Sequence, residues 1–483
     1  MAQDGGSRDR RARRLSPRDA SGGKARADPG WTLVTCILAS SLSFVDGSVT
    51  GVALPAIRDS FGAGGQQVQW VVNAYLLPLS ALLLLGGALG DHFGRRRLLV
   101  VGTSVFGVSS LVCAIAPSLP LLLAARAAQG IGAALLLPNS LALLNASFSG
   151  EKRGRAVGIW AAAGAAAAAI APLVGGWLVG TVGWPAIFYI NLPLAAGAII
   201  LALRFVKESS EPGAGRTDYA GALLATLGLG GLTYALTLWS ATRTFSNAAM
   251  MTAAAGIAML AAFLWVEYRR EKRAMMPVGL FGNRCFSGLN LLTFLLYGAF
   301  GAAMLLIPYV LITSGGYSPV RAGMAMLPLP ILMTSLSPTV GSLAARTGPR
   351  IPLTAGPLVV AAGLCLAVLA RADSGYWTSI FPMILVMAAG MTIAVAPLTS
   401  SVLGSVEEQH VAMASGFNSA VARTGGLIAT ALLGSVLASK GDELFAQFHW
   451  AMFASAAVAA LSAIVALTML GGVRMKGTPS SRG

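Results

Sequence analysis

Long apolar stretches recur along almost the whole 483-residue chain, and they constrain the fold more than any other feature of the sequence. Stretches of roughly 18 or more residues can cross a hydrocarbon core about 30 Å thick as α-helices. Strands of a membrane barrel would instead alternate apolar and polar residues in short blocks. Because 55% of the residues are hydrophobic and only 11% are charged, lipid must be the solvent for much of the surface. We therefore predict an all-α integral membrane protein.

Polar breaks separate these stretches into fourteen predicted transmembrane helices. The first thirty residues hold eight Lys and Arg but no apolar run, so we predict a disordered basic tail rather than a cleaved signal. The helices are predicted to begin near Trp31, Gln69, Leu98, Leu119, Ala156, Ile187, Tyr219, Ala248, Phe286, Ala322, Pro352, Trp377, Ala412 and Phe445.

Basic residues are divided unequally between the two sets of loops. If both termini are cytoplasmic, 27 of the 34 Lys and Arg lie on the cytoplasmic side and five lie outside, which is the bias of the positive-inside rule. The other two, Arg126 and Arg423, fall within predicted helices. The net charge of +16 is therefore interpreted as topology and not as a nucleic-acid surface. We predict a multi-pass plasma membrane protein with both termini cytoplasmic.

A repeated loop indicates two related halves. The loop after the second predicted helix recurs after the tenth, so helices nine to fourteen repeat helices one to six, and two helices are inserted. Transporters are built in this way, with the substrate site between the halves near the middle of the membrane. The identical pairs are Gly87 and Gly341, Leu89 and Leu343, Gly94 and Gly348, and Arg96 and Arg350.

The repeat divides the chain into five predicted segments. The two halves are flanked by basic tails and separated by the linker with its two inserted helices. The segments are the tail 1–30, the N-terminal half 31–204, the linker with the inserted helices 205–273, the C-terminal half 274–470 and the C-terminal tail 471–483.

The sequence offers no sign of an enzyme, a cofactor or a metal site. It has no phosphate-binding loop, and its three histidines, His92, His410 and His449, are scattered along the chain. The four cysteines have no paired spacing that would indicate a metal site or a disulfide framework. We interpret the cysteines as packing residues.

Asp46 is the one carboxylate that lies well inside a predicted helix. An ionised side chain there costs roughly 2.5 to 3.5 kcal/mol on insertion scales, so Asp46 should face the protein interior or a water-filled cavity. Desolvation favours its protonated form, which makes it a candidate proton carrier. The alternative is a structural carboxylate bonded to neighbouring hydroxyls such as Ser43 or Ser48.

Two arginines lie at membrane depth in the predicted topology. Arg126, in the fourth helix, cannot shed its charge, so its field is expected to influence when Asp46 holds a proton. The alternative is an arginine that only ties backbone carbonyls of neighbouring helices. Arg423, in the thirteenth helix, is interpreted as structural, with a side chain that extends toward the inner face.

Several motifs together resemble the major facilitator superfamily, specifically its fourteen-span branch of drug/proton antiporters (DHA2-like multidrug or antibiotic exporters). The resemblance covers nearly the whole chain after the tail. His92 stands where the loop motif usually has Arg, and Ala167 and Ala171 stand where the fifth-helix motif usually has Gly. The matching stretches are Asp46–Pro55, Gly87–Arg97, Leu119–Ala134, the fifth-helix residues Gly158, Pro172, Gly175 and Gly176, and Phe188–Pro193.

The resemblance implies roles for two of these motifs. The loop is expected to latch the cytoplasmic gate, with Asp91 capping or pairing with a helix end of the other half, although its arginines also enforce topology. The fifth helix, rich in small residues, is expected to slide or rotate against a neighbour, whereas static packing is the alternative. The gating-loop residues are Gly87, Asp91, Gly94, Arg95 and Arg96, and the antiporter-helix residues are Gly158, Pro172, Gly175 and Gly176.

Polar and aromatic side chains within the predicted helices are candidates for contact with substrate. With Asp46 as the only deep carboxylate, no spare acid is left for a dication, so neutral or monovalent amphiphiles are expected. The candidate lining residues are Asn73, Tyr75, Gln129, Trp160, Asn290 and Tyr297.

These features predict a monomeric, proton-coupled antiporter that exports small amphiphilic compounds by alternating access. It would be driven by the proton gradient, with no cofactor and no nucleic-acid partner. One alternative is a dedicated exporter of a single endogenous secondary metabolite that confers self-resistance. A second is a membrane receptor of the same fold that binds ligand without moving it.

Overall fold

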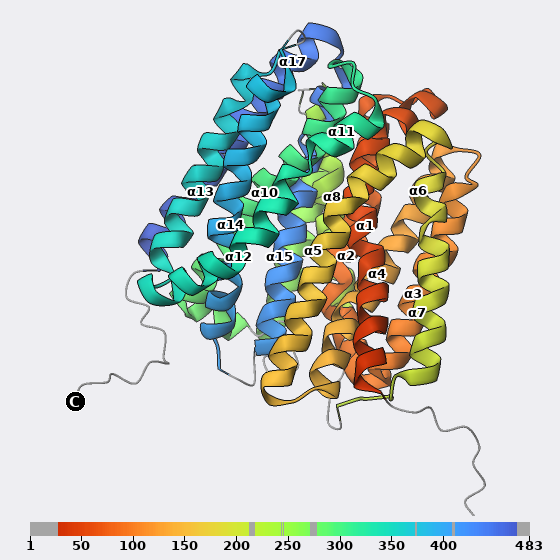
Figure 1. The fold of residues 1–483 in the computed structure, drawn as a ribbon, viewed down its shortest axis with the longest axis vertical. Helices are drawn as coiled ribbons and strands as arrows, with labels where there is room; N and C mark the ends of the chain where they lie inside the picture. Colours follow the sequence, from red (N-terminus) through yellow and green to blue (C-terminus); the bar gives the residue numbers. More distant parts are fainter. Residues whose placement is uncertain are drawn as a thin grey trace, which may run out of the picture.

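The computed structural model describes a bundle of helices that run along one long axis (Figure 1). The N-terminal half, coloured red to yellow, forms one side of the bundle, and the C-terminal half, coloured green to blue, forms the other. No strand occurs in the part of the chain that is described. The described residues are 28–211, 218–242, 244, 246–270, 278–371, 374–407 and 411–470.

The predictions for most of both tails, for part of the linker and for His410 lie outside those ranges. The first described helices are α1 (Pro29–Phe61), α2 (Gly65–Phe93), α3 (Arg95–Ala114), α4 (Leu119–Ser147), α5 (Gly150–Thr181), α6 (Ala186–Tyr189), α7 (Asn191–Phe205), α8 (Tyr219–Thr242) and α9 (Asn247–Arg270).

The remaining elements follow the second inserted helix. They are η2 (Val278–Gly282), α10 (Arg284–Thr313), α11 (Pro319–Ala325), α12 (Pro328–Thr347), α13 (Arg350–Cys365), η3 (Leu366–Leu369), η4 (Tyr376–Thr378), α14 (Ile380–Gly404), α15 (Val411–Ala431), α16 (Gly434–Ala438) and α17 (Gly441–Met469).

Thirteen helical segments of the described chain are long and apolar enough to cross a membrane. Three of them join successive pieces, α6 with α7, α11 with α12 and α13 with η3. The predicted thirteenth span corresponds to α15, a 21-residue helix that carries Asn418 and Arg423 and is not among the thirteen. The all-helical membrane architecture is confirmed, whereas the count of fourteen spans is not.

Both halves use one packing scheme. In the N-terminal half, α1 packs against α4, α5 and α7, and α4 packs against α2 and α3. In the C-terminal half, α10 packs against α14, α15 and α17, and α14 packs against α12 and α13. Each pair of the first half thus has a counterpart in the second, in the order that the repeated loop predicts. The exact segment boundaries stay predictions.

The inserted helices lie at one edge of the contact between the halves. α8 packs against α9 and also touches α2 of the first half and α15 and α16 of the second. Trp70 of α2 and Tyr234 of α8 have ring centroids 6.1 Å apart, and Ser240 accepts a hydrogen bond from Gly434 N–H of α16 at 3.2 Å. The insertion therefore covers one flank of the seam.

Hydrogen bonds between the halves gather at the end of the bundle where α1 finishes, which we call the far end. Arg58 of α1 donates to the hydroxyl of Tyr309 in α10 and, at 2.9 Å, to the carbonyl of Leu437 in α16. Gln69 of α2 donates to the Thr430 carbonyl of α15. The opposite end, where α1 begins and α17 finishes, is called the terminal end. The structure thus ties the two halves together at the far end.

Candidate functional site

Two buried charges meet near the middle of the N-terminal half. Arg126 of α4 donates through Nη1 to Oδ2 of Asp46 at 2.6 Å. The carboxylate lies close to the midpoint of the 33-residue α1. Asp46 is fully buried and Arg126 is 1% exposed, so bulk solvent does not screen the pair. The sequence predicted both residues, and the structure brings them into contact.

A glutamine joins the ion pair to the third helix. Gln129, nearly one turn after Arg126, accepts from Arg126 Nη1 at 2.9 Å. Through Nε2 it lies 3.4 Å from Asp46 Oδ1 and donates to Ser110 Oγ of α3 at 2.7 Å. Ser110 Oγ also accepts from Asn191 Nδ2 of α7 at 3.3 Å. The carboxylate is therefore part of a polar network that crosses four helices.

Aromatic rings and a carbonyl enclose the guanidinium. Arg126 Nε donates to the Val71 carbonyl of α2 at 3.0 Å. Its Cζ lies 4.5 Å from the Tyr75 ring centroid and 5.7 Å from that of Phe188, within cation–π range. The Tyr75 hydroxyl and Ser43 Oγ are 2.7 Å apart. These contacts hold the arginine in place beside the carboxylate.

A proton bound at Asp46 would change the charge balance of this site. Removing one partner of a buried ion pair costs roughly 3 to 5 kcal/mol, because an uncompensated charge remains. A proton on Asp46 cancels the carboxylate charge, whereas Arg126 cannot lose its own. Protonation therefore weakens the link between α1 and α4 and leaves a cation in need of a new partner.

The predicted gating loop is held by the segment that follows α7. Gly94 has φ of 107°, which side chains rarely adopt, and a Cβ there would lie 2.7 Å from the carboxyl carbon of Glu208. Glu208 accepts from the backbone N–H of Arg96 at 2.9 Å and of Arg97 at 3.2 Å. Its carboxylate thus caps the N-terminus of α3. Gly87, earlier in α2, packs against Pro138 of α4.

Asp91 corrects one expectation, because it pairs inside its own half. Its carboxylate accepts from Arg95 at 2.7 to 2.8 Å, and its carbonyl accepts from Glu211 N–H at 3.0 Å. Arg95 also lies 3.3 Å from the Glu211 carboxylate. A guanidinium one turn away offers charge-assisted hydrogen bonds that a helix end of the other half does not match.

The fifth helix meets the other half through its predicted antiporter residues. A Cβ on Gly176 would lie 2.3 Å from the carbonyl oxygen of Pro319 in α11. Reciprocally, a Cβ on Gly323 of α11 would lie 2.2 Å from the carbonyl of Pro172. The two backbones touch directly, which requires small residues at both positions.

The other two residues of that motif have different surroundings. Gly175 faces α1, where an added Cβ would lie 1.8 Å from Cγ2 of Val49. Gly158 lies nearer the terminal end, and a Cβ added there would meet nothing within 4 Å. The close packing of α5 therefore does not extend to Gly158, although a Cβ on Gly164, near the middle of the helix, would lie 2.6 Å from the Phe44 ring.

Two of the six candidate lining residues belong to the charge site, namely Tyr75 and Gln129. A third, Trp160, ties α5 to its neighbours, since its Nε1 donates to Ser40 Oγ at 2.9 Å and to Ser140 Oγ at 3.1 Å. Trp160 is thus a packing contact in this conformation.

The remaining three lie along the contact with α15 or on α10. Asn73 accepts from Thr430 Oγ1 at 2.5 Å, and Asn290 accepts from Asn418 Nδ2 at 3.1 Å. Tyr297 is partly buried on α10. The structure does not bring these three to the ion pair, and their contact with substrate stays a prediction.

Sequence reasoning missed several functional contacts. Arg58 is one of the five basic residues that the predicted topology places outside, yet its side chain donates to Tyr309 and to the Leu437 carbonyl across the far end. Ser110 and Cys113 occur in an ordinary apolar stretch and carry no motif, although the Cys113 thiol lies 3.4 Å from Gln129 Oε1. The polar residues of α3 that fall one turn apart were the only available signal.

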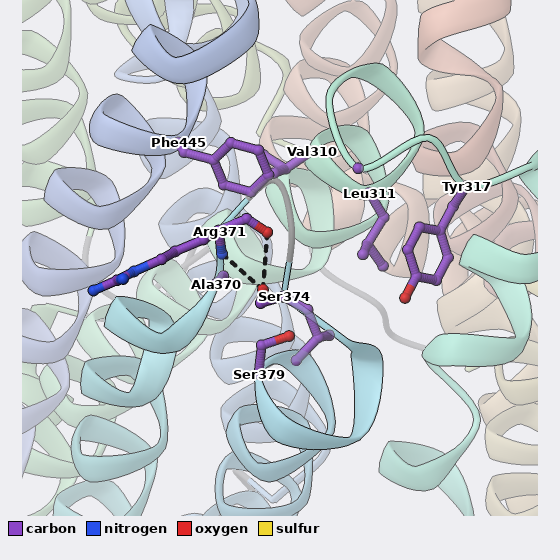
Figure 2. A pocket seen from close by; sticks show the side chains of 10 residues that line it. Val310, Leu311, Tyr317, Ala370, Arg371, Ser374, Ser379 and Phe445 are labelled. Atoms are coloured by element: carbon purple, nitrogen blue, oxygen red, sulfur yellow. Dashed lines mark hydrogen bonds between the residues drawn. The ribbon is translucent and has the colours of Figure 1, made fainter.

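A small pocket lies at the far end of the C-terminal half, away from the ion pair (Figure 2). Its volume of about 20 Å³ suits roughly one water molecule. Figure 2 shows the Arg371 side chain extending away from the other labelled side chains, while its backbone bonds to Ser374. We assign this pocket no part in substrate binding. Its lining residues are Val310, Leu311, Gly315, Tyr317, Ala370, Arg371, Ser374, Ser379, Ile380 and Phe445.

Two similarly packed halves, membrane-length helices and a buried ion pair beside the seam define a multi-pass membrane transport protein. The chain belongs to the major facilitator superfamily. The sequence model described as Major Facilitator Superfamily matches residues 36–283 and 289–482. Membership makes the chain a transporter and not an enzyme.

Curated relatives are named for drug resistance and efflux. "Multidrug resistance protein Stp" of Mycobacterium tuberculosis is 34% identical over 84% of this chain and 76% of its own length. "Tetracenomycin C resistance and export protein" of Streptomyces glaucescens is 31% identical, with coverage of 89% and 80%. "Methylenomycin A resistance protein" of Bacillus subtilis is 32% identical, with coverage of 84% and 87%.

Solved structures of the same fold are more distant in sequence. A POT family transporter crystallised in complex with a thioalcohol-conjugated peptide has a TM-score of 0.67 at 13% identity, covering 91% of this chain and 95% of that one. At such identity the likeness extends to the fold alone. It supports the two-half architecture independently of the sequence motifs.

Proposed function

We propose that the chain is a proton-coupled antiporter that exports small amphiphilic compounds, such as drugs or antibiotics, across the plasma membrane by alternating access. The observation that carries the proposal is the fully buried contact between Asp46 and Arg126. The names of the relatives support the substrate class, since they describe multidrug resistance and antibiotic export.

Two features of the geometry support a cycle of this kind. The halves are tied at the far end, so substrate enters from the terminal end, which the bias of basic residues assigns to the cytoplasm. A proton that reaches Asp46 after the halves reorient weakens the pair with Arg126, and the reset releases it inside. A membrane potential of 100 mV supplies about 2.3 kcal/mol per charge, enough for roughly a fifty-fold gradient of a neutral substrate.

A second candidate is an exporter dedicated to one metabolite. It is favoured by the relatives that are named for a single antibiotic, tetracenomycin C or methylenomycin A. Both candidates share the fold and the proton site and differ only in substrate breadth. A receptor that binds without transport has no observation in its favour beyond the fold.

The test is dye uptake into inverted membrane vesicles with an imposed pH gradient. Nile red serves as the neutral dye and ethidium as the lipophilic cation. We expect Asp46→Asn to abolish gradient-driven uptake, because an amide carries no proton through the cycle. Asp59→Asn is the matched control, since Asp59 lies on the same helix but is exposed.

The outcomes separate the candidates. Uptake that persists in Asp46→Asn would contradict proton coupling through this residue. Uptake of neither dye by the native chain, with Asp46-dependent uptake of a single natural antibiotic, would favour the dedicated exporter. Binding of ligand without any uptake would favour the receptor.

A further inference from the structure

Arg423 is a charge at the middle of the bundle that the ion-pair site does not use. It lies twelve residues after the start of α15 and eight before its end. At 1.5 Å per residue, about 12 Å or more of helix separates it from either end. Its side chain therefore stays at mid-membrane depth, contrary to the interpretation that it extends to the inner face.

The face of α15 that carries Arg423 is turned toward the seam between the halves. Ala420, one turn before it, packs in an apolar cluster with Tyr75 of α2. Thr430, two turns after it, donates to Asn73 of α2. Residues with this spacing share one side of a helix. Arg423 consequently faces the N-terminal half rather than lipid.

Two tyrosines lie within electrostatic range of the guanidinium. Arg423 interacts electrostatically with the phenol groups of Tyr75 and Tyr297. Tyr75 is the residue whose ring lies under Arg126. The second arginine therefore lies across the seam from the ion-pair site and shares a neighbour with it.

No acid compensates this charge within the part of the chain that the structure describes. The ion pairs found there do not include Arg423, and no hydrogen bond from its guanidinium is found. The deep carboxylate of Asp46 is already bound by Arg126 and Gln129. One acid and two arginines leave the centre with a net charge of +1. Arg423 nevertheless remains partly exposed, so a partner can reach it.

We propose that Arg423 binds a carboxylate of the transported compound, with the partly buried Tyr297 of α10 as a neighbouring apolar and hydrogen-bonding contact. The proposal rests on the transport function proposed above and adds a preference within the substrate class: amphiphiles that carry an acidic group bind more tightly than neutral ones. A guanidinium fork matches a carboxylate with two parallel hydrogen bonds. A tyrosine such as Tyr297 offers a large apolar face and a polar tip to the rest of such a molecule.

The experiment compares two ligands that differ only in charge. 1-Pyrenebutyrate and 1-pyrenebutanol share a ring system and chain, and their affinities for the purified full chain are measured by equilibrium dialysis against protein-free detergent. We expect the native protein to bind the butyrate at least about tenfold more tightly, as a charge-assisted hydrogen bond implies. Arg423→Gln should bring the ratio close to one, and Arg423→Lys should restore part of it. Arg371→Gln, an exposed arginine at the far end, should leave the ratio unchanged.

Thermal unfolding separates recognition from a structural role. Since Arg423→Gln removes an uncompensated charge, its midpoint temperature should equal or exceed that of the native chain, whereas loss of a structural arginine would lower it. An unchanged ligand ratio in Arg423→Gln, equal affinities in the native chain, or no binding of pyrenebutyrate would overturn the proposal. The assay uses no proton gradient, so its failure is distinguishable from a failure of proton-driven uptake.

Discussion

A single carboxylate in the middle of the bundle accepts hydrogen bonds from two side chains that also hold each other. Arg126 and Gln129 both approach Asp46, and Arg126 bonds to Gln129 as well. Each of these three side chains depends on the other two for its polar partners. The free-energy cost of replacing one of them therefore depends on which of the others are still present. This coupling is a property of residues and can be measured as one.

A double-mutant cycle tests it. Arg126→Gln alone should lower the thermal unfolding midpoint, because the Asp46 carboxylate loses its counter-charge in a buried site. Adding Asp46→Asn should recover part of that loss, for a coupling free energy of about 1 to 3 kcal/mol. Strictly additive effects would show that the two side chains do not interact energetically.

For individual residues, the sequence predicted which side chains form the site better than it predicted which of them touch. Asp46 and Arg126 stand out in the sequence because charged side chains are costly to place in lipid. Their 2.6 Å contact could not be predicted, since it depends on the rotation of α1 relative to α4. Ser110 was missed because a serine in an apolar helix usually bonds its own backbone.

At the scale of elements, α5 and α11 form a close backbone contact between the halves. Their backbones touch through Gly176 with Pro319 and through Gly323 with Pro172. Small residues permit such an approach and also leave little to interlock, so the contact can separate without large rearrangement. Packing of this kind suits elements that part and rejoin in every cycle.

An alanine pair on α5 probes this contact. Gly176→Ala should reduce dye uptake several-fold, because its Cβ would meet the Pro319 carbonyl at 2.3 Å. Gly180→Ala, one turn on, should leave uptake near the native rate, since its closest neighbour, Val320, lies at 3.8 Å. Equal uptake by both variants would show that the close approach is not required.

The loop between α2 and α3 shows where the prediction for an element failed. Its glycine turn and its arginines were predicted, but the partner of Asp91 was not. The segment after α7 supplies Glu208 and Glu211, two acids that have no special spacing in the sequence. Tertiary proximity alone makes them partners of the loop.

On the scale of the whole molecule, the far end is closed by contacts between the halves. Gly65 of α2 lies so close to Ala438 that an added Cβ would be 2.5 Å from its backbone nitrogen. If the halves move as rigid bodies, they are apart at the terminal end when they touch at the far end. A bulky side chain that forces the far ends apart should therefore bring the terminal ends closer together.

Gly65→Val provides that wedge. The separation of the terminal ends is measured between two spin labels. The labels are attached to cysteines that replace Lys152 of α5 and Ile351 of α13, both of which are exposed. Cys285 and Cys365 are replaced by serine so that they are not labelled. The mean distance should shorten in Gly65→Val. The matched control is Gly64→Val, whose Cβ meets nothing closer than 3.8 Å and which should leave the mean distance unchanged. Identical mean distances in the native chain, Gly65→Val and Gly64→Val would contradict rigid-body exchange.

The overall architecture was accessible from the sequence because lipid imposes strict requirements. Backbone groups in hydrocarbon must bond within their own helix, so apolar length alone predicted nearly every span. The break between α11 and α12 was not predicted. Several other prolines of this chain lie inside continuous helices, so Pro328 by itself did not indicate a break. The helix α15 shows why the number of spans is difficult to count from apolar length. Polar residues that face the seam make this helix less apolar than the other spans.

The inserted helices have a consequence for how compounds reach the seam. α8 lies against α2, α15 and α16 on one flank, whereas on the other flank α5 packs against α12 and the terminal-end part of α5 is largely exposed. A compound dissolved in the bilayer would thus find lateral access on one side only. For such compounds the concentration that governs transport is that within the membrane, so apparent affinity should rise with their lipid partitioning and fall when excess lipid dilutes them.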